Sequence, residues 1–163
     1  ARDTPVIPAL QFEHASVVKG PEIGMPQAVI DGHQETLEGG MESALKIFKA
    51  GGRLGMGGDY GFAWNPHGTY AKELSFFVEQ VGFSAVDTIK CATQTGAEIM
   101  GRAEEFGTLE AGKLADVLVV DADLEKNIAA LEDTGNFIAV VQGGFIKAGR
   151  LAQHQPAVRG VVQ

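Results

Sequence analysis

The sequence predicts an α/β protein in two parts, the first alternating helices with short strands and the second mainly β. Up to about Met100, apolar residues recur at helical spacing between short apolar runs. After Gly107 the pattern changes to strand-like runs, "ADVLVVDAD" and "FIAVVQGGFIKAGR". We therefore expect one part to cover residues 1–104 and the other to cover residues 105–163.

Composition limits the classes of function. The 163 residues are 45% apolar and 21% charged, which is typical of a globular chain with a hydrophobic core. A formal net charge of -8 opposes binding to nucleic acid or to an anionic membrane surface. No apolar stretch reaches the ~20 residues that a membrane span needs. Cys91 is the only cysteine, so no intrachain disulfide can form and a reducing, cytoplasmic location is expected.

The first fifty residues combine a strand-like run, an irregular stretch and a helix. Residues 4–12 are apolar and contain two prolines, which predicts a buried strand at the start or the edge of a sheet. Residues 14–38 show little periodicity and several Gly and Pro, so a long irregular excursion is expected. Apolar residues at helical spacing over 37–48, followed by Gly51-Gly52, predict an amphipathic helix and its C-terminal stop.

The next segment is predicted to be a strand followed by two helices. Apolar residues alternate with glycines over 54–59, as in a short strand. Apolar residues at helical spacing predict a helix over 69–81. Ser84, followed three residues later by Asp87, matches a capping box and predicts the start of the second of these helices.

The final part is predicted to contain a β-hairpin. A short helix or turn near 128–131 separates the two strand-like runs. Gly143-Gly144 lies between two apolar-rich arms, which is typical of a hairpin turn. The tail from Leu151 is expected to be a frayed end or a docking strand.

The stretch "RLGMGGDYG", residues 53–61, places one acid, Asp59, directly behind a Gly-rich apolar run. Small residues in a strand let another backbone or a ligand approach closely, so an aspartate at the end of such a strand is a candidate site residue. A turn or an N-cap aspartate is an equal alternative. A phosphate-binding loop is rejected, because no G-K-[ST] follows the glycines and no helix starts directly after them.

Other local motifs do not indicate catalysis. The four histidines include no pair at the i,i+2 or i,i+4 spacing that would place two imidazoles on one metal ion; they are His14, His33, His67 and His154. No G-x-S-x-G nucleophile motif occurs. Cys91 lies in a helical pattern, where burial would make its thiol unreactive.

The order of elements from Asp59 onward is more informative. An acid that ends a strand is followed by a loop with an aromatic residue and a histidine, a helix, "CATQTGAEIMG", "GTLEAGKLADVLVVDADL" and the hairpin sequence. Together these features resemble the C-terminal part of the amidohydrolase superfamily, in particular its imidazolonepropionase-like and Xaa-Pro dipeptidase-like branch. The resemblance runs from about Val6 to Arg150. Its most specific motif is "GTLEAGKLADVLVVDAD", which follows the family pattern G-x-L-x-x-G-K-x-A-D-[LIV]-[LIV]-[LIV].

The resemblance implies a fold. Members have a (β/α)8 TIM-type barrel that carries the site at its C-terminal face, and a small β-sandwich assembled from both chain ends. Residues 6–10 would resemble the seventh barrel strand and residues 54–59 the eighth. Residues 1–104 would then be the C-terminal part of a metal-dependent hydrolase barrel, and residues 105–163 the C-terminal part of the composite sandwich.

The resemblance also implies a chemistry. Members hydrolyse a C-N bond of an amide, dipeptide or cyclic amide with one or two divalent ions, for which zinc is expected here. Asp59 aligns with the family's strand-eight aspartate, which contacts the metal or its water and takes a proton from that water. His67, in "NPHG", would contact substrate; a polar residue ahead of the next helix is an equal alternative. Tyr60 and Trp64 would line the pocket.

Several family features have no counterpart in the chain. The strand-one His-x-His, a mid-barrel Lys or Glu and two later metal-binding histidines belong to segments that would precede Ala1. We therefore expect a C-terminal segment of a longer enzyme, whose partners are the missing barrel segment, a dipeptide or other small-molecule substrate and, in a homo-oligomer, a second copy. Two alternatives stay open: a noncatalytic fragment or association subunit, and a same-fold hydrolase of phosphotriesters or other non-amide substrates. Lys113 and Asp116 are interpreted as structural, at a turn and a strand entry.

Overall fold

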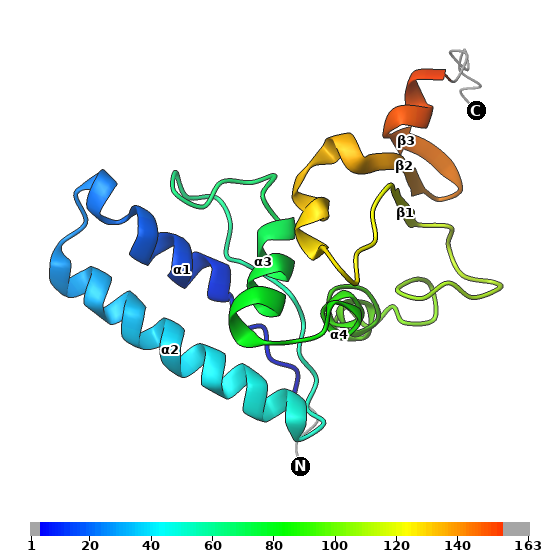
Figure 1. Ribbon diagram of the computed structural model, residues 1–163. Helices are drawn as coiled ribbons and strands as arrows, with labels where there is room; N and C mark the ends of the chain where they lie inside the picture. Colours follow the sequence, from blue (N-terminus) through cyan, green and yellow to red (C-terminus); the bar gives the residue numbers. More distant parts are fainter. Residues whose placement is uncertain (1–3, 155–163) are drawn as a thin grey trace.

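A computed structural model describes residues 4–154 of the chain, and two long helices form one side of it (Figure 1). Helices α1 (Leu10–Lys19) and α2 (Gln27–Lys49) lie side by side and are joined by a 3-10 turn, η1 (Pro21–Ile23). The prediction of a helix over 37–48 is confirmed, although α2 begins ten residues earlier.

The predicted irregular excursion over 14–38 is wrong, because most of it is helical. Of the glycines in this stretch, Gly32 lies inside α2, where it costs about 1 kcal/mol relative to alanine, and Gly20 and Gly24 flank the short turn η1. Packing against α1 explains a different glycine of this helix, Gly40. A Cβ on Gly40 would lie 2.7 Å from the Leu10 side chain, so glycine is needed where the two helices meet.

Residues near the start of the chain approach the Gly-rich segment as a parallel pair. Val6 and Leu54 form an isolated parallel bridge. The Val6 N–H donates to the Arg53 carbonyl and the Gly55 N–H donates to the Val6 carbonyl, both at 3.0 Å. Two segments nearly fifty residues apart are thereby placed next to each other, with their carboxyl ends on the same side.

The predicted strands over 4–12 and 54–59 are nevertheless wrong in length. Neither segment forms a ladder beyond the single bridge, and α1 already begins at Leu10. Pro8 lacks the N–H group that the next bond of a longer ladder on this side would use.

The helices predicted after the Gly-rich segment are confirmed, with π-helical turns between them. They run as α3 (Ala71–Phe76), η2 (Phe77–Val81), α4 (Ala85–Lys90), η3 (Cys91–Thr95) and α5 (Gly96–Ile99). The Ser84 hydroxyl accepts the Asp87 backbone N–H at 3.0 Å, so the predicted cap of α4 is also confirmed. Cys91 is 4% exposed and burial raises its pKa, which agrees with an unreactive thiol.

The last part forms the predicted hairpin within a small antiparallel sheet. Its order is β1-β2-β3, with bounds β1 (Val117–Val120), β2 (Phe137–Gln142) and β3 (Phe145–Ala148). Gly143 and Gly144 have φ values of 56° and 82°, as a tight hairpin turn of this type requires. The Asp116 carboxylate accepts the Gly143 N–H at 2.6 Å, which supports the structural interpretation of Asp116.

Short 3-10 helices connect and end this sheet. The predicted helix near 128–131 is confirmed as η4 (Ile128–Glu132), and η5 (Thr134–Asn136) follows it. The tail was expected to fray or to dock as a strand, but residues 150–154 form a further 3-10 helix, η6 (Arg150–His154). The remainder of that tail lies outside the described residues.

The main core joins the two long helices to α3 and η2. Its buried members are Leu10, Leu37, Ala44, Leu54, Phe76, Phe77, Val81, Phe83 and Cys91. Between residues 4 and 154, no helix is long and apolar enough to cross a membrane.

Candidate functional site

The glycines of residues 53–59 let two isoleucines pack against the backbone. A Cβ on Gly55 would lie 2.6 Å from the Ile99 side chain, and a Cβ on Gly57 would lie 2.8 Å from that of Ile7. Larger residues would push these neighbours away. The glycines therefore have a packing role. Asp59, at the end of the segment, has no such role.

Asp59 ends this segment in an unusual backbone conformation, and its side chain has no partner among residues 4–154. Its φ is 47°, in the left-handed region that few non-glycine residues adopt. The residue is exposed, and its carboxylate makes no hydrogen bond or ion pair with the residues that the structure describes. An N-cap role is excluded, because the next helix, α3, begins only at Ala71.

Asn65, which sequence reasoning missed, closes the loop that follows Asp59. The residue is 1% exposed. Its carboxamide nitrogen donates to the Gly58 carbonyl at 2.6 Å and to the Asp59 carbonyl at 3.2 Å. Its backbone bonds with Gly61 and Phe62 complete a tight turn. The only sequence signal was an Asn-Pro dipeptide, which is typical of a turn but does not identify its partners.

Tyr60 and His67 are brought together through Tyr70. The Tyr60 hydroxyl donates to the Tyr70 carbonyl at 3.2 Å, and the two rings meet edge to face with centroids 4.8 Å apart. The Tyr70 hydroxyl lies 3.2 Å from His67 Nδ1. Burial is the main cause that raises the pKa of Tyr60, so its phenol stays neutral and can only donate or accept a hydrogen bond. His67 is exposed on the loop.

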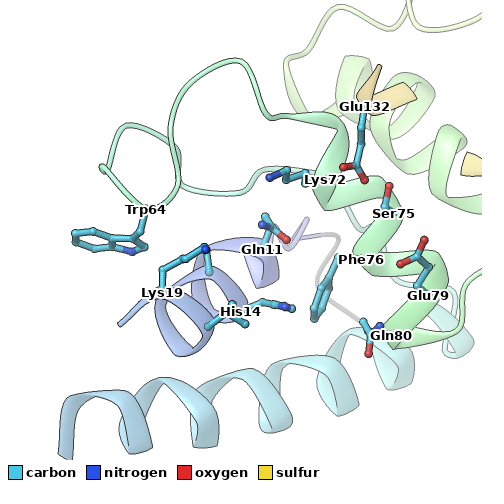
Figure 2. Close-up of a pocket in the computed structure, with 12 residues that line it drawn as sticks. Gln11, His14, Lys19, Trp64, Lys72, Ser75, Phe76, Glu79, Gln80 and Glu132 are labelled. Atoms are coloured by element: carbon cyan, nitrogen blue, oxygen red, sulfur yellow. The ribbon is translucent and has the colours of Figure 1, made fainter. Parts of the chain in front are cut away.

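Trp64 lines a cavity between α1 and α3 (Figure 2). This cavity has a volume of about 280 Å³ and is also lined by His14, Lys72 and Ser75. Asp59, Tyr60 and His67 are not among its lining residues. The cavity wall and the carboxylate of Asp59 are therefore separate features of the molecule.

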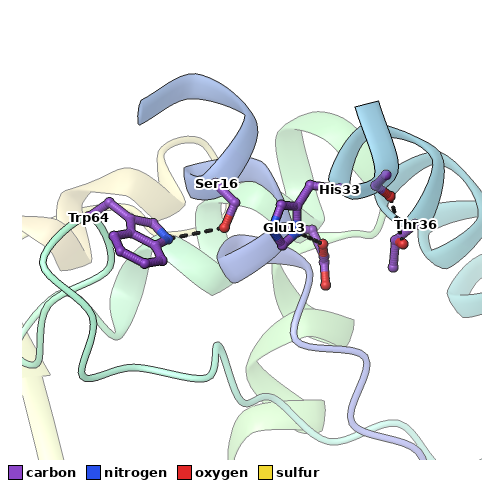
Figure 3. Close-up of polar contacts among 6 residues, drawn as sticks. Glu13, Ser16, His33, Thr36 and Trp64 are labelled. Carbon is purple, nitrogen blue, oxygen red and sulfur yellow. Dashed lines mark hydrogen bonds and ion pairs between the residues drawn. The ribbon is translucent and has the colours of Figure 1, made fainter. Parts of the chain in front are cut away.

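Trp64 also attaches the loop to α1 (Figure 3). Its indole N–H donates to the Ser16 hydroxyl at 3.0 Å, and Ser16 is fully buried. The Trp64 ring packs 5.1 Å from that of Phe62 and 6.5 Å from that of Phe12. Helix α1 is in turn linked to α2 by Glu13 Oε2 and His33 Nδ1, 2.6 Å apart. These contacts hold the loop in place.

Glu73 is a second missed residue, buried on α3. It is 1% exposed, and its two carboxylate oxygens accept the backbone N–H groups of Leu10 at 3.2 Å and Gln11 at 2.8 Å. Those N–H groups begin α1, so Glu73 caps that helix from another element. Burial raises the pKa of Glu73 to about 7, against the opposing effect of the two N–H donors. A sequence motif could not reveal this cap, because donor and acceptor are 62 or 63 positions apart.

The described residues fit one metal ligand, not a complete metal site. No group of three His, Cys, Asp or Glu side chains within residues 4–154 converges so as to hold an ion. Asp59 has an exposed carboxylate without a competing partner in this part of the chain, which could ligate a divalent cation, zinc included. Any further ligands would have to come from outside these residues.

The chain belongs to the amidohydrolase family. The profile described as "Amidohydrolase family" matches residues 15–147. A curated relative, imidazolonepropionase from Thermoanaerobacter pseudethanolicus, is 27% identical over 122 residues, which cover 71% of this chain. The resemblance predicted from "GTLEAGKLADVLVVDAD" is thereby confirmed.

Solved structures of prolidase type are also similar. A crystal structure of a protein from Bifidobacterium longum assigned as a prolidase covers 88% of this chain with a TM-score of 0.79 and 28% identity. A Xaa-Pro dipeptidase crystallised with methionine in its active site covers 90% of this chain, with a TM-score of 0.73 and 26% identity. The chain spans 29% of the imidazolonepropionase and 35% of each of these two structures.

Proposed function

We propose that this chain supplies the catalytic acid and base of a metal-dependent amidohydrolase that cleaves the C-N bond of an amide, dipeptide or cyclic amide. One observation carries the proposal: an exposed carboxylate without a partner in the described residues, Asp59, ends a Gly-rich segment in a chain of this family. The imidazolonepropionase and the Xaa-Pro dipeptidase support a cyclic amide or a dipeptide as the substrate class.

The proposal includes the architecture that the resemblance implies. Residues 1–104 would form the last part of a (β/α)8 barrel, and residues 105–163 part of a small β-sandwich. The parallel bridge between Val6 and Leu54 supports adjacent barrel strands, and the antiparallel sheet supports the sandwich assignment. In a barrel, the carboxyl ends of the strands carry the site, and Asp59 follows the carboxyl end of one of them.

In this mechanism Asp59 moves one proton. A divalent ion held in part by Asp59, for which we propose zinc, would lower the pKa of an attacking water toward neutrality when bound. The Asp59 carboxylate accepts a proton from that water as the water attacks the carbonyl carbon. Asp59 then returns the proton to the nitrogen as the C-N bond breaks.

The neighbouring residues would contact substrate. His67 is exposed and lies 3.2 Å from the Tyr70 hydroxyl, so one ring nitrogen is held while the other is available for a substrate group. The Tyr60 hydroxyl holds the backbone of Tyr70 through its hydrogen bond to the Tyr70 carbonyl. Trp64, proposed as a pocket residue, acts mainly as the anchor of the loop on α1.

Replacement of Asp59 tests the proposal directly. In the full-length protein that carries this chain, Asp59→Asn should lower kcat for a dipeptide or cyclic amide by ~100-fold or more, which is a typical contribution of a general acid and base. Activity should also be lost on chelation and return with added zinc. Glu35→Gln on the exposed side of α2 is a matched carboxylate control and should leave kcat unchanged. Near-normal turnover of Asp59→Asn would remove the proposed role.

A noncatalytic subunit is the second candidate, because residues 4–154 contain no three-ligand metal group. Metal content separates the two. Under the catalytic proposal, the 163-residue chain gains zinc and hydrolytic activity only when the remaining barrel segment is supplied. If the assembled protein binds no metal and hydrolyses no amide, the association role holds. A panel that includes a phosphotriester tests the non-amide alternative.

A further inference from the structure

The backbone at Asp59 is held in a conformation that its own side chain does not stabilise. A φ of 47° costs a non-glycine residue of order 1 kcal/mol or more, and such residues persist only where their surroundings fix them. The Asp59 carboxylate makes no hydrogen bond within the described residues. Another group must therefore hold this residue.

The Asn65 carboxamide is that group. Its nitrogen donates at 2.6 Å to the Gly58 carbonyl, in the peptide plane before the Asp59 Cα, and at 3.2 Å to the Asp59 carbonyl, in the plane after it. Fixing both planes fixes φ and ψ of Asp59. The direction of its Cα–Cβ bond is then set as well.

Asn65 is itself immobilised. It is 1% exposed, its backbone carbonyl accepts the Gly61 N–H at 3.0 Å, and its own N–H donates to the Phe62 carbonyl at 3.1 Å. Both groups that face the carboxamide nitrogen are carbonyls, which only an NH₂ group can satisfy. This pair of hydrogen bonds therefore requires asparagine at position 65 and excludes aspartate.

We infer that Asn65 is a positioning residue that fixes the backbone of Asp59 and thereby aims its carboxylate. The inference rests on the proposed function for its catalytic consequence. It extends that function from Asp59, which moves the proton, to Asn65, which orients Asp59.

The test combines a structure with kinetics of the full-length protein. A crystal structure of Asn65→Ala should show Asp59 out of the positive-φ region. The kcat of this variant should fall at least tenfold, with KM within about threefold of wild type. Asn136→Ala is the matched control, since the Asn136 carboxamide donates to a loop carbonyl, that of Ala130, at 2.9 Å beside the sheet. This control should keep wild-type kcat.

A double variant excludes a merely structural role. If Asn65 acts through Asp59, adding Asn65→Ala to Asp59→Asn should lower kcat no further. An equal additional loss would overturn the inference, as would an unchanged Asp59 φ in Asn65→Ala. Should Asn65→Ala not fold, Asn65→Ser takes its place with the same expected outcomes, because serine keeps a single donor on a shorter side chain. If Asp59→Asn keeps full activity while the φ change occurs, the proposed function fails but the backbone role stands.

Discussion

Two carboxylates on either side of the 60–70 loop have opposite environments. Asp59 is exposed and has no partner among the described residues, whereas Glu73 is buried and accepts two backbone N–H groups. A carboxylate that must exchange protons with water or ligate a cation needs oxygen lone pairs that are free of other partners. In a carboxylate that caps a helix, both oxygens already accept backbone N–H groups. The difference separates a candidate reactive acid from a structural one within fifteen residues of sequence.

The largest expected effect that sharpens this comparison is on stability. Glu73→Ala leaves two N–H groups of α1, one buried and one partly buried, without an acceptor, so it should lower the free energy of unfolding by about 3 kcal/mol. Asp59→Asn should change it by less than ~0.5 kcal/mol, because the site is exposed and asparagine tolerates positive φ. Urea unfolding of both variants measures the contrast. Equal losses would erase the distinction between the two acids.

The pH dependence of stability gives a second, smaller contrast. The pKa of Glu73 is raised from 4.5 to about 7, so the folded state binds a proton more tightly than the unfolded state. Its stabilising contribution is present below about pH 4.5 and is lost as pH rises through 7. Wild type should therefore lose more stability between pH 5 and 8 than Glu73→Gln, by about 1–3 kcal/mol. Parallel curves for the two proteins would contradict the buried-acid assignment.

The smallest expected effect concerns His67. If its free ring nitrogen contacts substrate, His67→Ala should raise KM several-fold and lower kcat less. Steady-state kinetics of the full-length protein measure the two constants separately. His33→Ala is a suitable control, because His33 is engaged with Glu13 between α1 and α2. An unchanged KM would leave His67 as a loop residue held by Tyr70.

Local patterns predicted those elements that local bonds stabilise. The cap at Ser84 and the turn at Gly143-Gly144 depend on neighbours within a few positions, and both predictions are confirmed. The strand predicted over 54–59 needed a long partner that residues 4–154 do not provide. The irregular stretch predicted over 14–38 is wrong because the packing of α1 against α2, a tertiary contact, outweighs the local signal of Gly32 inside α2.

The candidate site could be predicted only in part. Asp59 stood out because an acid after a Gly-rich run is a local signal that the family motif supports. Asn65 and Glu73 could not be found in this way. Their partners are backbone groups, which carry no side-chain signature, and those of Glu73 lie more than sixty residues away.

Trp64 gives this loop a built-in optical reporter. It is the only tryptophan in the chain, and its indole N–H is hydrogen-bonded to a fully buried serine on α1. Indole emission depends on the polarity around the ring, so the tryptophan fluorescence of the chain reports on the surroundings of this loop alone. Titration of ligands or denaturant can thus follow this segment without any added dye.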